Sequence, residues 1–296
     1  MSKFNTLPLA FFGKGKFEIA QAHTQIEPLY KDKKDYKKEL KNLQKKIDEH
    51  QNKMYAHDQY GMLIVFQALD AAGKDSTIKN VFKDVHPLGT AFHSFKRPSD
   101  KELDHDYMWR CFKELPERGK IMVFNRSYYE ELLVVKVHPE IVDNAQKIPK
   151  ALKEKADFWE NRYSDIRNFE KYLNNNGIVV MKFFLNVSKK EQGRRLIDRI
   201  QIQEKNWKFE EGDIRERGFW SEYQQAYEEL INKTSSEESP WHVIPADDKK
   251  SMRLLVAAAI EKKLASLDMD YPETSDERQA ELKKFIGTIQ EQDAED

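Results

Sequence analysis

Residues 61–77 read GMLIVFQALDAAGKDST, and this stretch says most about the architecture of the chain. An apolar run typical of a buried strand passes into a short turn, which ends in Gly73-Lys74 at the predicted start of a helix. Backbone N–H groups at a helix N-terminus attract anions, and a lysine there adds a full positive charge. The stretch therefore predicts a strand, a phosphate-binding turn and a helix.

A second apolar run of the same kind follows about 50 residues later. Residues 120–124, KIMVF, lead into Asn125-Arg126-Ser127. If both runs are neighbouring strands of a parallel sheet, their carboxyl ends face one crevice, where such folds bind ligands. The pair of motifs predicts a phosphoryl-transfer site.

The remaining apolar runs extend this pattern into a sheet. Five runs fall near residues 62–69, 90–95, 120–125, 178–186 and 241–245, and helical patterns lie between most of them. Strands that alternate with helices indicate right-handed crossovers and a mostly parallel sheet. We therefore expect an α/β fold with a five-stranded sheet.

The chain divides into three predicted parts. Residues 1–57 comprise an extended strap (1–25) and an amphipathic helix, residues 58–270 form the phosphotransferase domain, and residues 271–296 are a polar tail. The helix is predicted from about Ile26 to Ala56, because apolar residues recur there at helical spacing. This stripe fits either a docking or oligomer helix or a helix that lies on its own domain; its members are Tyr36, Leu40, Leu43, Ile47 and Met54.

Composition narrows the classes of function. The chain has 50 Lys and Arg against 51 Asp and Glu, so its net charge is −1, which disfavours a dedicated nucleic-acid-binding domain. The single cysteine, Cys111, excludes an intramolecular disulfide and is expected to pack among its aromatic neighbours. No stretch reaches about 18 apolar residues, and no leader is evident, so we expect a cytoplasmic protein without a membrane anchor.

The phosphate turn departs from the usual Walker A pattern, GxxxxGK[ST]. Ala68 replaces the first glycine, and Asp75 replaces the hydroxyl residue after Lys74. A carboxylate inside such a turn repels phosphate unless a cation lies between them, so Asp70 is predicted to bind Mg²⁺ directly or to contact a ligand of the ion. The alternative is an ordinary strand-to-helix turn with Asp as its cap. The other residues predicted to contact phosphate here are Ala71, Ala72, Gly73, Ser76 and Thr77.

The second strand end offers further candidates. Arg126 can neutralise charge on a transferring phosphoryl group, and Asn125 stands where many NTPases place an Asp for Mg²⁺. Glu130 and Glu131 are predicted to contact ribose or metal-bound water, with a solvated first turn of a helix as the alternative.

Two basic segments complete the predicted site. Lys96 and Arg97 follow the apolar run near residues 90–95, and residues 194–208 hold five basic against two acidic residues, a net charge of +3. The second segment is predicted to be part of a mobile lid over about residues 188–220, which closes on phosphates and excludes water. A solvated helix face is the alternative. The lid candidates are Arg195, Arg199, Lys205 and Lys208. Trp207 is expected to pack in the core, with stacking on a base as the alternative.

Taken together, the motifs resemble those of the polyphosphate kinase 2 family, in order from about Tyr30 to Ala265. They are the turn 68–76, the segment 96–98, the strand end 124–130 and the pair Arg195-x-x-Asp198-Arg199 with Lys205-x-Trp207-Lys208. The strand end, with residues 134–138 behind it, looks most like the class III members, which are associated with phosphorylating both AMP and ADP.

The resemblance implies a three-layer α/β/α, P-loop-kinase-like sandwich with a helical lid. It also implies a catalytic role for Asp70, with Lys74, Arg126, Arg195 and Arg199 on phosphate groups. The resemblance further implies Mg²⁺ as the cofactor, with Mn²⁺ as a substitute. Its expected substrates are inorganic polyphosphate and adenine or guanine nucleotides, and the expected assembly is a homodimer or homotetramer. Two other hypotheses stay open: an ATP-dependent nucleoside or nucleotide kinase of the thymidylate type, and a non-catalytic polyanion- or RNA-binding protein.

Overall fold

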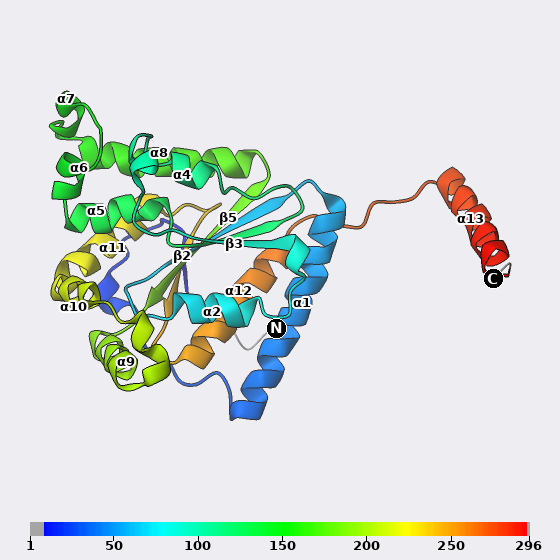
Figure 1. Ribbon diagram of the computed structural model, residues 1–296, viewed down its shortest axis with the longest axis horizontal. Helices are drawn as coiled ribbons and strands as arrows, with labels where there is room; N and C mark the ends of the chain where they lie inside the picture. The colour runs from blue at the N-terminus through cyan, green and yellow to red at the C-terminus, as the bar shows by residue number, and fades with distance from the viewer. Residues whose placement is uncertain (1–8, 295–296) are drawn as a thin grey trace.

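The computed structural model describes residues 9–294 of the chain. These residues form one sheet between two layers of helices (Figure 1). The strands are β1 (Ala10–Phe11), β2 (Gly61–Gln67), β3 (Thr90–Ser94), β4 (Ile121–Asn125), β5 (Ile178–Asn186) and β6 (Trp241–Pro245). All five predicted apolar runs are strands, and the predicted α/β class is confirmed.

The sheet has six strands, so the predicted number of five is wrong. Its order is β1-β6-β5-β2-β4-β3, and every pair is parallel except β1 with β6. The additional strand, β1, has only two residues, which are too few to produce an alternating pattern that the sequence could reveal.

The two faces of the sheet carry separate cores. One core packs beneath α1 (Lys33–His57), α2 (Lys74–Val81) and α12 (Lys249–Ala265), and the other beneath α8 (Phe158–Asn175) and α11 (Trp220–Thr234). Figure 1 shows the same division, with α8 and α11 across the sheet from α1 and α12. The predicted three-layer arrangement is therefore present.

The remaining helices are short, apart from α9 and α13. They are α3 (Asp100–Leu103), α4 (Trp109–Phe112), α5 (Val134–Val137), α6 (Glu140–Asn144), α7 (Lys150–Lys153), α9 (Lys189–Gln201), α10 (Glu211–Gly218) and α13 (Asp276–Ala294). Four 3₁₀ helices join them: η1 (Ile19–Gln21), η2 (Pro87–Gly89), η3 (Tyr128–Leu132) and η4 (Gln203–Lys208).

The N-terminal helix begins later than predicted. Its first residue is Lys33, not Ile26, because the side chain of Asp32 accepts hydrogen bonds from the free N–H groups of Lys34 and Asp35 and so caps the helix. Every member of the predicted stripe is buried, and α1 packs along α12. The stripe is therefore part of this domain's own core, which removes its use as a docking face.

The two ends of the chain differ in their contacts with the rest of the protein. Residues 1–8 of the predicted strap lie outside the described residues. The part from residue 9 onward crosses α11, where Phe17 and Ile19 donate backbone hydrogen bonds of 2.8 Å to the side chains of Asn232 and Glu228. At the other end, α13 stands away from the body (Figure 1) and buries none of its residues.

The lid segment predicted at about 188–220 contains α9, η4 and α10, and it follows β5 at the carboxyl edge of the sheet. Within residues 9–294, none of the helices combines the length and the apolar character that a bilayer crossing requires.

Candidate active site

The phosphate turn joins β2 to α2 through backbone conformations that few side chains adopt. Ala71 has φ +62° and Gly73 has φ +112°, and Gly73 is the residue that caps α2. A glycine is required there because a φ of that value strains any L side chain. The turn thus directs the N–H groups at the start of α2 toward the carboxyl edge of the sheet.

The side chains of the turn are already bonded. Lys74 is buried and donates to the carbonyl of Ala68 at 2.7 Å. The hydroxyls of Ser76 and Thr77 both donate back to the carbonyl of Gly73, at 3.0 and 2.9 Å. The lysine therefore lies folded over the turn, where an anion bound by the N–H groups would meet its charge.

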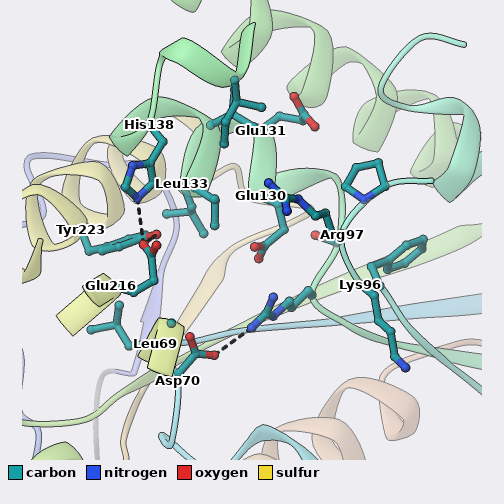
Figure 2. Close-up of a pocket in the computed structure, with 18 of the residues that line it drawn as sticks. Leu69, Asp70, Lys96, Arg97, Glu130, Glu131, Leu133, His138, Glu216 and Tyr223 are labelled. Carbon is teal, nitrogen blue, oxygen red and sulfur yellow. Dashed lines mark hydrogen bonds and ion pairs between the residues drawn. The ribbon is translucent and has the colours of Figure 1, made fainter. Parts of the chain in front are cut away.

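The two predicted strand ends lie side by side. Phe66 of β2 is paired with Asn125 of β4, and the backbone N–H of Arg126 donates to the carbonyl of Phe66 at 3.0 Å. Arg126 has a left-handed backbone, with φ +63°, which turns its guanidinium toward the phosphate turn. There it forms an ion pair of 2.8 Å with Asp70, drawn as a dashed line in Figure 2. The predicted crevice therefore exists.

Four charges are concentrated at this point. Burial would raise the pKa of the Asp70 carboxyl, but the charges of Lys74 and Arg126 outweigh burial and lower it. Burial is the main cause that lowers the pKa of Lys74, with Arg126 adding to it. Burial also raises the pKa of Glu130, which Arg126 and Lys74 oppose. Asp70 is thus held ionised between two cations.

A cavity of about 700 Å³ opens over these groups. Six of the predicted residues line it: Asp70, Lys96, Arg97, Arg126, Glu130 and Glu131. Figure 2 shows labelled members of this set converging from separate elements, with Asp70 at the bottom, Lys96 and Arg97 on one side and Glu130 above Asp70. A cavity lined by these six charged groups, three basic and three acidic, suits a multiply charged substrate.

Asn125 lies outside this cavity. It donates to Asp75 at 2.8 Å, and both residues line a smaller hollow of about 400 Å³ beside β3. Lys205 and Lys208 are exposed on η4, and Arg199 forms an ion pair of 2.7 Å with Asp213 of α10. Lys205 and Lys208 therefore do not contact the turn, whereas Arg199 lies close enough for its charge to help lower the pKa of Asp70.

Arg195 is predicted to bind phosphate groups from the lid, but its side chain lies elsewhere. It is buried, 4% exposed, and its guanidinium donates to the carbonyls of Ala71, Ala72, Ala246 and Asp247 as well as to Glu191. Its donors are all used by protein acceptors. Arg195 therefore supports the backbone of the phosphate turn from behind, and it is not placed to bind phosphate.

Glu131 and Trp207 also differ from what the sequence suggested. For Glu131 the alternative of a solvated turn is wrong, because the residue is buried and accepts a hydrogen bond of 2.6 Å from Arg162 of α8. Trp207 is not in the core: it is 77% exposed, and the ammonium of Lys208 lies over its ring. Cys111, in contrast, is buried as expected.

Sequence reasoning missed a polar cluster on the lid side of the cavity. Glu216 of α10 accepts hydrogen bonds from Tyr223 at 2.6 Å and interacts with His138 at 2.9 Å, as Figure 2 shows. Gln192 of α9 donates to the carbonyl of Asp70 at 3.1 Å. These residues come from the end of α5 and from α9, α10 and α11, so no local motif could have grouped them.

The donor set fits a magnesium ion. Asp70 is ionised, partly exposed and at the edge of the cavity, and Mg²⁺ is usually held by one or two carboxylates together with substrate phosphates. Within residues 9–294, no three His, Cys, Asp or Glu side chains form a preformed metal cage. A site of this type needs none, because the substrate supplies the other oxygens.

A parallel sheet with a phosphate turn, and an arginine on the neighbouring strand end, define a phosphotransferase of the P-loop type. The sequence model described as Polyphosphate kinase 2 (PPK2) matches residues 30–274. The chain belongs to the polyphosphate kinase 2 family.

Individual relatives agree with this assignment. The ADP-polyphosphate phosphotransferase of Rhodopseudomonas palustris is 45% identical over 91% of this chain and 93% of its own length. The AMP/ADP-polyphosphate phosphotransferase of Meiothermus ruber is 38% identical over 94% and 98%. The crystal structure of Polyphosphate Kinase 2 from Arthrobacter aurescens TC1 superposes with a TM-score of 0.84 at 33% identity, covering 94% of this chain and 95% of that one.

Proposed function

We propose that this protein transfers the terminal phosphoryl group of inorganic polyphosphate to AMP and to ADP, in a reversible, Mg²⁺-dependent reaction. The observation that supports this most is the cluster of Asp70, Lys74 and Arg126 where β2 and β4 end, beside a charged cavity that Asp70 and Arg126 line. The relatives named for ADP and for AMP/ADP as acceptors support the choice of nucleotides.

The chemistry requires little proton transfer. The acceptor is a phosphate oxygen that is already anionic near pH 7, so positioning and charge neutralisation supply most of the catalysis. Lys74 would exchange the carbonyl of Ala68 for a phosphate oxygen, and Arg126 would stabilise charge on the transferred group. Asp70 is then a metal-binding and orienting group, since its lowered pKa makes it a poor proton acceptor.

Mg²⁺, with Mn²⁺ as a substitute, would be held by Asp70 together with substrate phosphates. When bound, the metal neutralises charge between the donor and the acceptor phosphates. Asn125 is engaged by Asp75 and lies outside the main cavity, which leaves the metal to Asp70.

The remaining expectations belong to the same proposal. Adenine nucleotides are the expected acceptors, and guanine nucleotides are expected to react as well. We also propose a homodimer or homotetramer in the cytoplasm, without a nucleic-acid partner.

The test is to incubate the purified protein with long-chain polyphosphate, Mg²⁺ and either AMP or ADP, and to follow the nucleotides by chromatography. We expect ATP from ADP, and ADP followed by ATP from AMP. ATP from ADP alone would remove AMP from the proposal.

Two controls address the other hypotheses. Phosphorylation of a nucleoside by ATP without polyphosphate would identify a kinase of the thymidylate type. Salt-sensitive binding of polyphosphate or RNA without Mg²⁺-dependent turnover would identify a non-catalytic binder.

A further inference from the structure

We propose that helix α8 positions the catalytic strand end: its buried residues Glu170 and Arg162 hold the segment Tyr128–Glu131, and through it fix Arg126 and Glu130. This inference rests on the proposed function, because it concerns the reaction at the same site. Glu170 and Arg162 are positioning residues, since neither reaches the reacting groups.

The first anchor is the buried carboxylate of Glu170, which accepts hydrogen bonds from both tyrosines of the segment. Glu170 is 2% exposed, and one of its oxygens accepts from the hydroxyls of Tyr128 at 2.9 Å and Tyr129 at 2.7 Å. Its other oxygen accepts from the ammonium of Lys182, at 2.6 Å, on the central strand β5. Lys182 is itself fully buried and also donates to the hydroxyl of Tyr129 and the carbonyl of Thr234.

The second anchor, Arg162, lies about two turns before Glu170 on α8. Arg162, 3% exposed, donates to Glu131 at 2.6 Å, and Gln146 bridges the two side chains. Residues 128, 129 and 131 are therefore all bonded to α8 or to its partner on β5. Glu130 is the remaining member, and its carboxylate faces the cavity while that of Glu131 points away from it (Figure 2).

The segment needs such an anchor because of how it begins. Arg126 has φ +63°, a left-handed backbone that non-glycine residues adopt only when the surroundings impose it. Two and three residues after Arg126, Tyr128 and Tyr129 are buried in the core. Their pKa values are raised well above the ordinary one, first by burial and then by the charge of Glu170, so both hydroxyls stay protonated and donate.

The buried ion pair of Glu170 and Lys182 is better explained by a role in positioning the segment Tyr128–Glu131 than by a gain in stability. A buried ion pair replaced by well-packed apolar residues often leaves a protein equally or more stable. Here Lys182 lies in the middle of strand β5, which is otherwise almost wholly apolar, and its partner Glu170 lies on α8. What the charges provide is a fixed acceptor for two hydroxyls, and hence a fixed orientation for the residues on either side.

The decisive variant is the double change Tyr128→Phe and Tyr129→Phe. It removes both hydroxyls but keeps both rings, and it leaves the Glu170–Lys182 pair and the bond from Lys182 to Thr234 intact. We expect kcat for ADP phosphorylation to fall at least tenfold, while the KM values for ADP and polyphosphate change less than about twofold. The matched control is Tyr163→Phe, which removes the hydroxyl of another buried tyrosine, on α8, that accepts a hydrogen bond from Lys136 instead.

The outcomes separate cleanly. A loss of kcat in the double variant, at a melting temperature like that of Tyr163→Phe, supports the inference. A kcat within twofold of wild type overturns it, and so does an equal loss of kcat in Tyr163→Phe, since that would reflect stability alone. Absence of turnover in the wild type overturns the proposed function, and this inference with it.

A second variant covers the case in which the double change does not fold. Arg162→Lys keeps the charge but cannot reach Glu131 and Gln146 together. We expect the same fall in kcat with little change in KM. Unchanged kcat in folded Arg162→Lys overturns the part of the inference that concerns Arg162.

Discussion

Asp70 illustrates how much a single residue can indicate at this site. A carboxylate in a phosphate-binding turn is unfavourable on its own, and the structure places it between Lys74 and Arg126, at the edge of the cavity. The lowered pKa keeps it ionised, which suits a ligand for a divalent cation.

We therefore expect Asp70→Asn to lower turnover by about 10²- to 10³-fold, the usual loss when a key electrostatic group is removed. The measurement is kcat at saturating Mg²⁺, polyphosphate and ADP. Asp84→Asn, an exposed carboxylate just beyond α2, serves as the matched control and should behave like wild type. Near-normal turnover of Asp70→Asn would contradict the assignment.

At the scale of a helix, α9 separates two arginines that the sequence predicted to act together. Arg195 faces inward and binds four backbone carbonyls behind the phosphate turn. Arg199, one turn further, pairs with Asp213 on the lid helix α10. The first supports the turn, and the second remains available to an anionic substrate.

Substitutions on α9 should show this division. Arg195→Lys is expected to destabilise the fold by about 2 kcal/mol, since a lysine has too few donors to span the carbonyls. Arg199→Ala is expected to leave stability nearly unchanged and to raise the KM for polyphosphate roughly tenfold. Unfolding by urea and steady-state kinetics check both. The reverse pattern would show that Arg195, not Arg199, contacts the substrate.

For the whole molecule, the stability of the sheet should depend on pH through His242 of β6. Its ring lies beside Phe183, and its Nδ1 is 3.2 Å from the carbonyl of Lys182. Burial lowers the pKa of His242 to about 4. The unfolded chain, with an ordinary pKa near 6.5, therefore takes up a proton first as the pH falls.

Its contribution to stability is complete above about pH 6.5 and is lost as the pH falls toward 4. Between pH 7 and pH 5 the loss due to this group should be about 1–2 kcal/mol. Urea unfolding of wild type and His242→Gln at both pH values measures it, and the variant should lose less. An equal loss in both proteins would exclude His242 as the cause.

The parts of the site that the sequence predicted are those that a short stretch of chain determines. The strand, the turn and the helix around Gly73-Lys74 depend on neighbouring residues, and so does the end of β4 at Arg126. Parallel pairing of the two strands was then enough to place Asp70 beside Arg126. The sixth strand was missed, because a two-residue strand has no pattern of its own.

By itself, then, the sequence determined the α/β class, the phosphate turn, the acidic and basic groups at two strand ends, and the family. Only the tertiary structure decided what Arg195, Glu131, Glu170 and Lys182 do, since each depends on partners 12 to 124 residues away along the chain. A motif records which chemical groups the chain possesses. Burial and pairing decide which of those groups face the substrate and which hold the others in place, and both arise only when distant segments pack together.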